Sequence, residues 1–153
     1  MNTRMEFWKA APAAFKALSS LEEYLHASGI DKRLLHMVKL RASQMNGCAY
    51  CIDMHWKDAR AAGESEQRLY GLDAWRESPY YSDKERAAFE WTEALTDITT
   101  GHVADAVFDA VRGQFSDKEL ADLSWAIAAI SAWNRMSIAF RSEPGKYKPA
   151  MHA

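Results

Sequence analysis

Apolar residues recur at helical spacing along nearly the whole chain, and few residues interrupt this pattern. The 153 residues include only four prolines and seven glycines. Because proline and glycine are the residues that most often end a helix, long helices can form between them. No segment shows the convincing alternation of polar and apolar residues that indicates a half-buried strand. The sequence therefore predicts an all-α fold.

Start and stop signals divide the chain into about six to seven helices. Pro12 suits the first turn of a helix, because its missing N–H is no loss there, and the helix is expected to end near Gly29. Asp31 can cap the next helix, which runs to the break at Asn46 and Gly47. A third helix then carries the segment CAYCIDMHWKDARAA and ends at the following glycine.

Two pairs of residues in the second half are typical of helix N-termini. Ser82 is followed by Glu85, and Ser116 by Glu119, so each pair can form a capping box. A short helix near 66–70 and another between 103 and 115 are also expected, and the last helix runs to about Arg141. We expect a single-domain helical bundle over 1–153, with a loose tail over 144–153.

Charge and hydropathy exclude several classes of function. The net charge is -2, without the basic patch that a nucleic-acid partner would require. No apolar run approaches the ~18 residues of a membrane span. The first segment, MNTRMEFWKAAPAAF, lacks the apolar centre of a secretory signal. We therefore expect a cytoplasmic protein that acts without nucleic acid or membrane partners.

The two cysteines, Cys48 and Cys51, are three residues apart. A disulfide-stabilised secreted domain would use more cysteines, spaced to close longer loops. A bridge between these two would close almost no loop and would add little stability through chain entropy. The spacing therefore indicates chemistry rather than a structural bridge.

His55 extends this pair along the same helix. Positions i, i+3 and i+7 share one helix face, so Cys48, Cys51 and His55 are expected to point the same way. Side chains three residues apart lie about 5–6 Å from each other, and a disulfide accepts Cα separations of roughly 4.4–6.8 Å. The pair can therefore open and close within the helix, while His55 exchanges a proton with the Cys51 thiol. Cys48 is expected in the first turn, where the helix dipole favours a thiolate.

Other interpretations of these residues remain open. The two cysteines could be small packed residues of a buried helix. A structural zinc site needs four ligands, and Cys48, Cys51 and His55 supply three, with His36 or His102 as the candidates to complete it. No second cysteine pair exists, so we expect no metal, and the tryptophans and methionines are explained by packing rather than by a cofactor.

The segment HMVKLRASQMNGCAYCIDMH, from His36 to His55, resembles the signature of the alkylhydroperoxidase D-like proteins of the carboxymuconolactone decarboxylase-like superfamily. The resemblance continues through AWRESPYYSDKERAAFEWTEALT and FSDKELADLSWAIAAISAWNRMSIAFR. It implies an all-helical fold that assembles into trimers or hexamers, and the six tryptophans also favour a homo-oligomer. It further implies a hydroperoxide substrate and a dithiol reductant, for which the family suggests a lipoyl-bearing protein.

The resemblance also implies a role for each site residue. Cys51 would attack the peroxide, Cys48 would resolve the sulfenic acid to a disulfide, and His55 would belong to a proton relay. The helix dipole alone would instead favour Cys48 as the thiolate. His36 stands where the family usually has a relay glutamate, and a neutral histidine cannot supply that negative charge. The carboxylates that could substitute are Glu85, Glu90 and Glu93.

Three functions are therefore weighed. The first is thiol-dependent hydroperoxide reduction by the cysteine pair with a histidine proton relay. The second is a carboxymuconolactone decarboxylase-type reaction, which would not need a dithiol. The third is a non-catalytic, redox-sensing oligomer that uses the pair as a switch.

Overall fold

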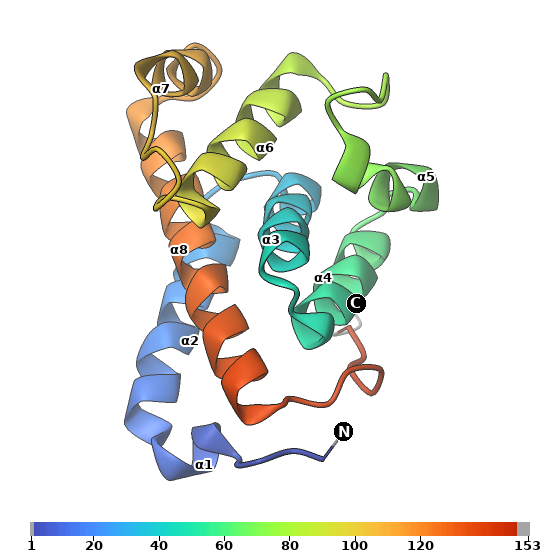
Figure 1. Cartoon of the computed structure of the whole chain (residues 1–153), viewed down its shortest axis with the longest axis vertical. Coiled ribbons are helices and arrows are strands. Elements are labelled where there is room, and N and C mark those ends of the chain that lie inside the picture. The colour runs from blue at the N-terminus through green and yellow to red at the C-terminus, as the bar shows by residue number, and fades with distance from the viewer. Residues whose placement is uncertain (1, 150–153) are drawn as a thin grey trace.

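The computed structural model describes residues 2–149, and every regular element in that range is a helix (Figure 1). The all-α, single-domain fold is therefore confirmed. The elements in chain order are α1 (Phe7–Ala10), α2 (Pro12–Ala27), α3 (Lys32–Asn46), α4 (Ala49–Ala61), α5 (Glu66–Tyr70), the 3-10 helix η1 (Leu72–Ala74), α6 (Asp83–Thr96), α7 (Asp105–Arg112) and α8 (Asp117–Phe140).

The expected helix caps at Asp31, Ser82 and Ser116 are confirmed, and one helix was missed. Asp31 accepts a hydrogen bond from the backbone N–H of Leu34, and both expected capping boxes are formed. The missed element is α1, which is four residues long and therefore too short to show a hydrophobic period. It forms because Phe7 is buried and its ring lies 5.6 Å from that of Phe140. The described part of the chain thus holds eight α-helices rather than six to seven.

Helix α3 lies at the centre of the bundle and packs against α4, α6 and α8 (Figure 1). Its apolar side chains are buried on several faces, as in Leu35, Met37, Val38 and Leu40. A helix covered on several sides also buries its polar side chains, and these need partners or a function. The polar residues of α3 are therefore the place to search for a site.

The segment after α8 crosses α4 and is held there by hydrogen bonds. Lys57 donates to the backbone oxygens of Gly145 and Tyr147, both at 3.1 Å, and Asp53 accepts from the N–H of Gly145. The Tyr147 hydroxyl donates to Asp58 at 2.7 Å. The stretch 144–149 was expected to be loose, but these polar contacts attach it to α4. No periodic pattern in the sequence indicates such contacts. The end of the expected tail, 150–153, lies outside the described residues.

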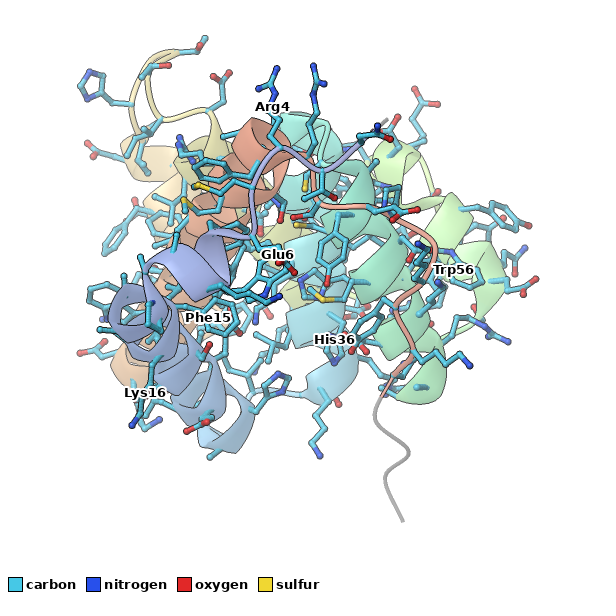
Figure 2. All side chains as sticks on the ribbon, turned by 90° about the horizontal axis from the view of Figure 1, so that it is seen from below. Arg4, Glu6, Phe15, Lys16, His36 and Trp56 are labelled. Atoms are coloured by element: carbon cyan, nitrogen blue, oxygen red, sulfur yellow. The ribbon has the colours of Figure 1, made fainter. Side chains whose placement is uncertain are left out.

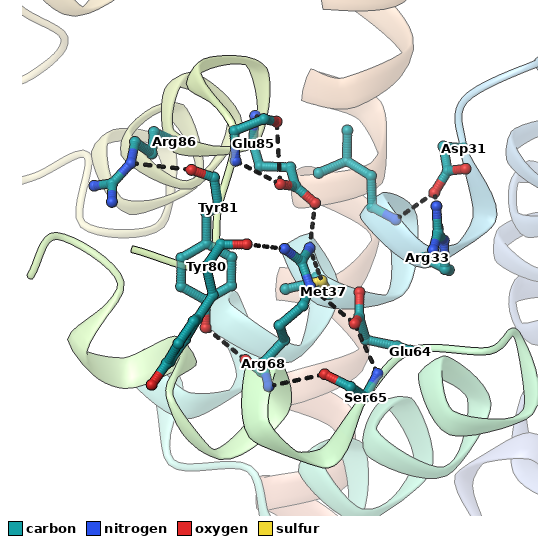
Figure 3. Close-up of polar contacts among 12 residues, drawn as sticks. Asp31, Arg33, Met37, Glu64, Ser65, Arg68, Tyr80, Tyr81, Glu85 and Arg86 are labelled. Carbon is teal, nitrogen blue, oxygen red and sulfur yellow. Dashed lines mark hydrogen bonds and ion pairs between the residues drawn. The ribbon is translucent and has the colours of Figure 1, made fainter. Parts of the chain in front are cut away.

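A second polar cluster holds the connection between α4 and α6 (Figure 3). The Arg68 guanidinium contacts the carboxylates of Glu64 and Glu85 and donates to the carbonyl of Tyr80. The same guanidinium stacks 5.0 Å from the ring centre of Tyr81.

Among residues 2–149, no helix is both long and apolar enough to cross a bilayer.

Candidate active site

The turn between α3 and α4 positions the two cysteines. Gly47 adopts the left-handed conformation, with φ of 68°, and ends α3. The residue after it, Cys48, is extended and donates its N–H to the carbonyl of Ser43 at 3.0 Å. Cys48 is thus the N-cap of α4 rather than part of its first turn, whereas Cys51 lies inside that turn. A glycine is needed at 47 because side chains with a Cβ rarely adopt this φ.

The two sulfurs lie 2.9 Å apart, as the sequence predicted, and both cysteines are buried and free. A disulfide requires a separation of about 2.05 Å, so a small movement of the side chains can form the bond. Because Cys48 stands at the helix end, its side chain can reach Cys51 without distortion of the helical backbone.

Hydrogen bonds give the two cysteines different pKa values. The hydrogen bond with Cys51 is the main cause that lowers the pKa of Cys48 to about 6, against the effect of burial. Backbone N–H groups of Cys51 and Tyr50 act in the same direction. The bond with Cys48, together with burial, raises the pKa of Cys51. Cys48 is therefore the more acidic thiol of the pair, and its position at a helix N-terminus acts in the same direction.

Cys51 and His55 face a cavity of about 580 Å³. Helices α2, α3 and α4 and the segment after α8 border this cavity. Aromatic side chains form much of its wall, namely Phe7, Trp8, Phe15, Tyr50 and Trp133. Figure 2 views this end of the molecule, with Phe15 and His36 labelled. Cys48 lies behind Cys51 and faces a separate hollow that Gly47 and Ser137 also line. A molecule in the aromatic cavity would therefore meet the sulfur of Cys51.

His36 on α3 and His55 on α4 meet in the same cavity, and their ring centres are 5.7 Å apart. His55 is 5% exposed, and neither of its ring nitrogens has a hydrogen-bond partner in the described chain. Burial is the main cause that lowers the pKa of His55 well below its usual value, and the nearby charges of Lys39, His36 and His26 lower it further. Burial of His55 therefore favours the neutral imidazole over the imidazolium.

Three polar contributions to this cavity were not found from the sequence. The Asp58 Oδ2 atom lies 4.0 Å from Nδ1 of His55, at the i,i+3 spacing that could have revealed it. Lys39 is buried and forms an ion pair with Glu22, whose other oxygen accepts from the indole of Trp133 at 3.0 Å. These contacts join α2, α3 and α8, so no spacing within one helix indicates them.

The chain matches the carboxymuconolactone decarboxylase family over residues 12–94. It belongs to that family. A Bacillus subtilis (strain 168) relative, the uncharacterized protein YdfG, is 42% identical over 139 residues, covering 91% of this chain and 95% of its own. The uncharacterized protein YnjA of Escherichia coli (strain K12) is 32% identical over 123 residues, covering 78% and 66%.

Solved structures place this member of the carboxymuconolactone decarboxylase family among its alkylhydroperoxidase D-like proteins. One is an Agrobacterium tumefaciens protein of unknown function whose proposed role is that of the antioxidant defence protein AhpD. It is 44% identical with a TM-score of 0.91, covering 95% of this chain and all of its own. A peroxidase-related AhpD-core protein from Ralstonia eutropha JMP134 shares the fold at 20% identity and a TM-score of 0.80, covering 92% and 75%.

The other residues considered from the sequence lie elsewhere. Glu93 accepts hydrogen bonds from Trp75 at 2.7 Å and Arg41 at 2.9 Å, and Glu85 serves the Arg68 cluster and a capping box. Burial alone would raise the pKa of Glu93. The hydrogen bonds and the nearby arginine charges outweigh this effect and lower that pKa. Glu85, Glu90 and Glu93 are not among the described residues that line the cavity around Cys51. His102 lies in the turn between α6 and α7. The carboxylate nearest His55 is instead Asp58.

Proposed function

We propose that the chain is a thiol-dependent hydroperoxide reductase. The observation that carries this proposal is the order of three groups: Cys51 and His55 line one cavity, and the Cys48 sulfur lies 2.9 Å from that of Cys51. An attacking thiol, a base and a resolving thiol are the groups that such a reaction requires. The alkylhydroperoxidase D-like relatives support the same reaction class.

The first step oxidises Cys51. The proton on Cys51 passes to His55, and the thiolate attacks the terminal peroxide oxygen. The O–O bond breaks, Cys51 becomes a sulfenic acid, and the alkoxide takes a proton to leave as an alcohol. The low pKa of Cys48 suits the second step, which needs Cys48 as a thiolate. The same group raises the pKa of Cys51, so the first step depends on His55 to take the Cys51 proton.

In the second step the Cys48 thiolate attacks the sulfenic sulfur. The Cys48–Cys51 disulfide forms and the hydroxyl leaves as water once it is protonated. An external dithiol then reduces the disulfide by exchange and becomes a disulfide itself. A lipoyl-bearing protein is the proposed dithiol, and the aromatic cavity wall favours an apolar organic hydroperoxide.

His36 and Asp58 are proposed to complete the proton relay. His36 lies beside His55 at the cavity, so it can pass a proton between His55 and the substrate. The Asp58 carboxylate faces Nδ1 of His55 at 4.0 Å and can stabilise the imidazolium that forms when His55 takes the proton.

The decisive experiment is turnover of cumene hydroperoxide with dihydrolipoamide as the reductant. We expect catalytic turnover by the wild type and none by Cys51→Ser. Absence of turnover by the wild type, with the disulfide still reducible, would reject the reductase and favour the redox-sensing or decarboxylase alternative.

Peroxide stoichiometry without a reductant separates the two cysteines. Cys48→Ser should consume about one equivalent and stop at the sulfenic acid, whereas Cys51→Ser should consume almost none. The reverse result would assign the attack to Cys48, which has the lower pKa of the two cysteines.

We also propose that the protein works as a homo-oligomer, a trimer or hexamer. Several large apolar side chains are exposed on the described chain, among them Trp125 at 57% and Phe108 at 44%. Such surface is typical of a protein interface. Light scattering at micromolar concentration should report a multiple of the monomer mass, and a monomer would contradict this proposal.

A further inference from the structure

We propose that His36, His55 and Asp58 form a binding site for a divalent transition-metal ion, and that Zn²⁺ is the ion it fits. This site lies beside the cysteines and does not depend on them. The inference goes beyond peroxide reduction, which requires no metal.

The three ligand groups already converge. One nitrogen of each histidine and one oxygen of Asp58 lie within 4.8 Å of one another. Ligand atoms about 2.0–2.1 Å from a tetrahedral zinc ion are separated by about 3.4 Å. His36 comes from α3, whereas His55 and Asp58 are three residues apart on α4, so two helices in contact supply the three ligands.

The state of His55 is the second, independent observation. The side chain is 5% exposed, and both ring nitrogens lack a hydrogen bond from the described residues. Buried polar atoms without partners are uncommon, because each costs free energy that a hydrogen bond or a metal would recover. Metal ions bind an unprotonated ring nitrogen of the imidazole, and both nitrogens of His55 are without a hydrogen bond from the described residues.

The second carboxylate oxygen of Asp58 is held from outside the site. Tyr147 donates its hydroxyl to Oδ1 at 2.7 Å, while Oδ2 faces His55. Such an outer hydrogen bond orients a ligating carboxylate, as in many zinc sites. The nearby ammonium of Lys39 is compensated by Glu22, so it does not oppose a cation at full strength.

The donor set favours zinc over calcium or magnesium. Two imidazoles and one carboxylate match catalytic zinc sites, whereas the harder ions prefer oxygen ligands alone. Three protein ligands leave a fourth position, which would open on the cavity. The expectation of no metal considered cysteine ligands and left out Asp58, which supplies the missing anionic donor.

Where the proposed reductase function holds, the metal would oppose it. A zinc ion on His55 would occupy the lone pair that otherwise accepts the Cys51 proton. Zinc binding is therefore expected to inhibit peroxide reduction while it leaves the cysteines free.

The test is equilibrium dialysis of Zn²⁺ against the full chain carrying Cys48→Ser and Cys51→Ser, which removes both thiolate ligands. We expect one bound ion per chain. His36→Gln or Asp58→Asn in this background should weaken binding at least about tenfold, and Tyr147→Phe by roughly 10–100-fold. His102→Asn is the matched control, since it removes an exposed imidazole at a positive φ that asparagine tolerates.

Cobalt provides a second readout in the unmodified chain. Co²⁺ bound to His36, His55 and Asp58 should show visible d–d bands without a thiolate-to-metal charge-transfer band. A charge-transfer band that disappears in the cysteine double variant would place the ion on the thiols and overturn the proposal. Equal zinc binding by His36→Gln, Asp58→Asn and His102→Asn would also overturn it, as would no binding by the double variant. None of these measurements uses peroxide. A protein that does not bind zinc at this site could therefore still be a reductase, and a protein that does not reduce peroxide could still bind zinc.

Discussion

Two neighbouring residues of α3, His36 and Met37, face two polar regions of opposite character. Met37 contacts the guanidinium of Arg68, whose nitrogens meet two carboxylates and a carbonyl (Figure 3). His36 faces His55, whose ring nitrogens have no hydrogen bond in the described structure. The same helix thus borders a saturated polar cluster and an unsaturated one.

The difference separates polar groups that stabilise the fold from groups held ready for chemistry. In the Arg68 cluster the guanidinium offsets the burial of Glu64, whose side chain is 4% exposed. At His55 burial is not offset by hydrogen bonds, so the imidazole keeps its lone pair for a proton or a metal ion. Unsatisfied buried groups of this kind are concentrated at functional sites.

The strongest test of this contrast is His55→Leu. We expect peroxide reduction to fall by about 10²–10⁴-fold, the usual contribution of a general base. The free energy of unfolding should change by less than about 1 kcal/mol, because the lost imidazole had no hydrogen bonds to leave unmade. Steady-state kinetics and urea unfolding measure the two quantities. A loss of several kcal/mol in stability would break the comparison.

Arg68→Met should give the opposite result. Removal of one partner leaves the buried Glu64 carboxylate uncompensated, so the free energy of unfolding should fall by about 3 kcal/mol. The rate constant for peroxide reduction by the folded variant should be unchanged. Arg33→Met is the matched control, because its ion pair with Asp31 is exposed at 3.7 Å and should contribute less than about 1 kcal/mol.

A smaller effect is expected when His36 is replaced by the glutamate typical of the family pattern. His36→Glu places a carboxylate beside His55, which favours the imidazolium and thus proton transfer from Cys51. In the Cys48→Ser background, the single-turnover rate of peroxide consumption at neutral pH should rise by up to about tenfold, a modest part of the general-base range. An unchanged rate in a folded protein would place His36 outside the relay.

The smallest effect concerns Cys48, the well-partnered group of the redox site. Cys51→Ala removes the hydrogen bond that is the main cause of the low Cys48 pKa. The pKa should move upward from about 6 toward the ordinary thiol value, so less thiolate is present at neutral pH. The ultraviolet absorbance of the thiolate, followed against pH, measures this shift. A midpoint that stays near 6 would assign the effect to the helix N-terminus alone.

The sequence predicted those features that local rules determine. The capping boxes and the Asp31 cap follow from residues three apart, and the cysteine spacing predicted the close sulfurs. The sequence did not predict the contacts of Asp58 with Tyr147 or of Lys39 with Glu22. These side chains are brought together by helix packing and by the segment after α8, so periodicity within one helix carries no signal for them.

The cavity wall has a consequence for the order in which this protein folds. Residues from 3–8 and from 142–143 line the cavity together, and Arg4 pairs with Phe140 across 136 positions through backbone atoms. The α3–α4 hairpin that holds the cysteines needs only local contacts, which form early, whereas contacts between distant segments form late. The thiols are therefore assembled before they are enclosed. During that interval oxidants would reach both sulfurs, so we expect a newly made chain to form the Cys48–Cys51 disulfide more readily than the fully folded protein.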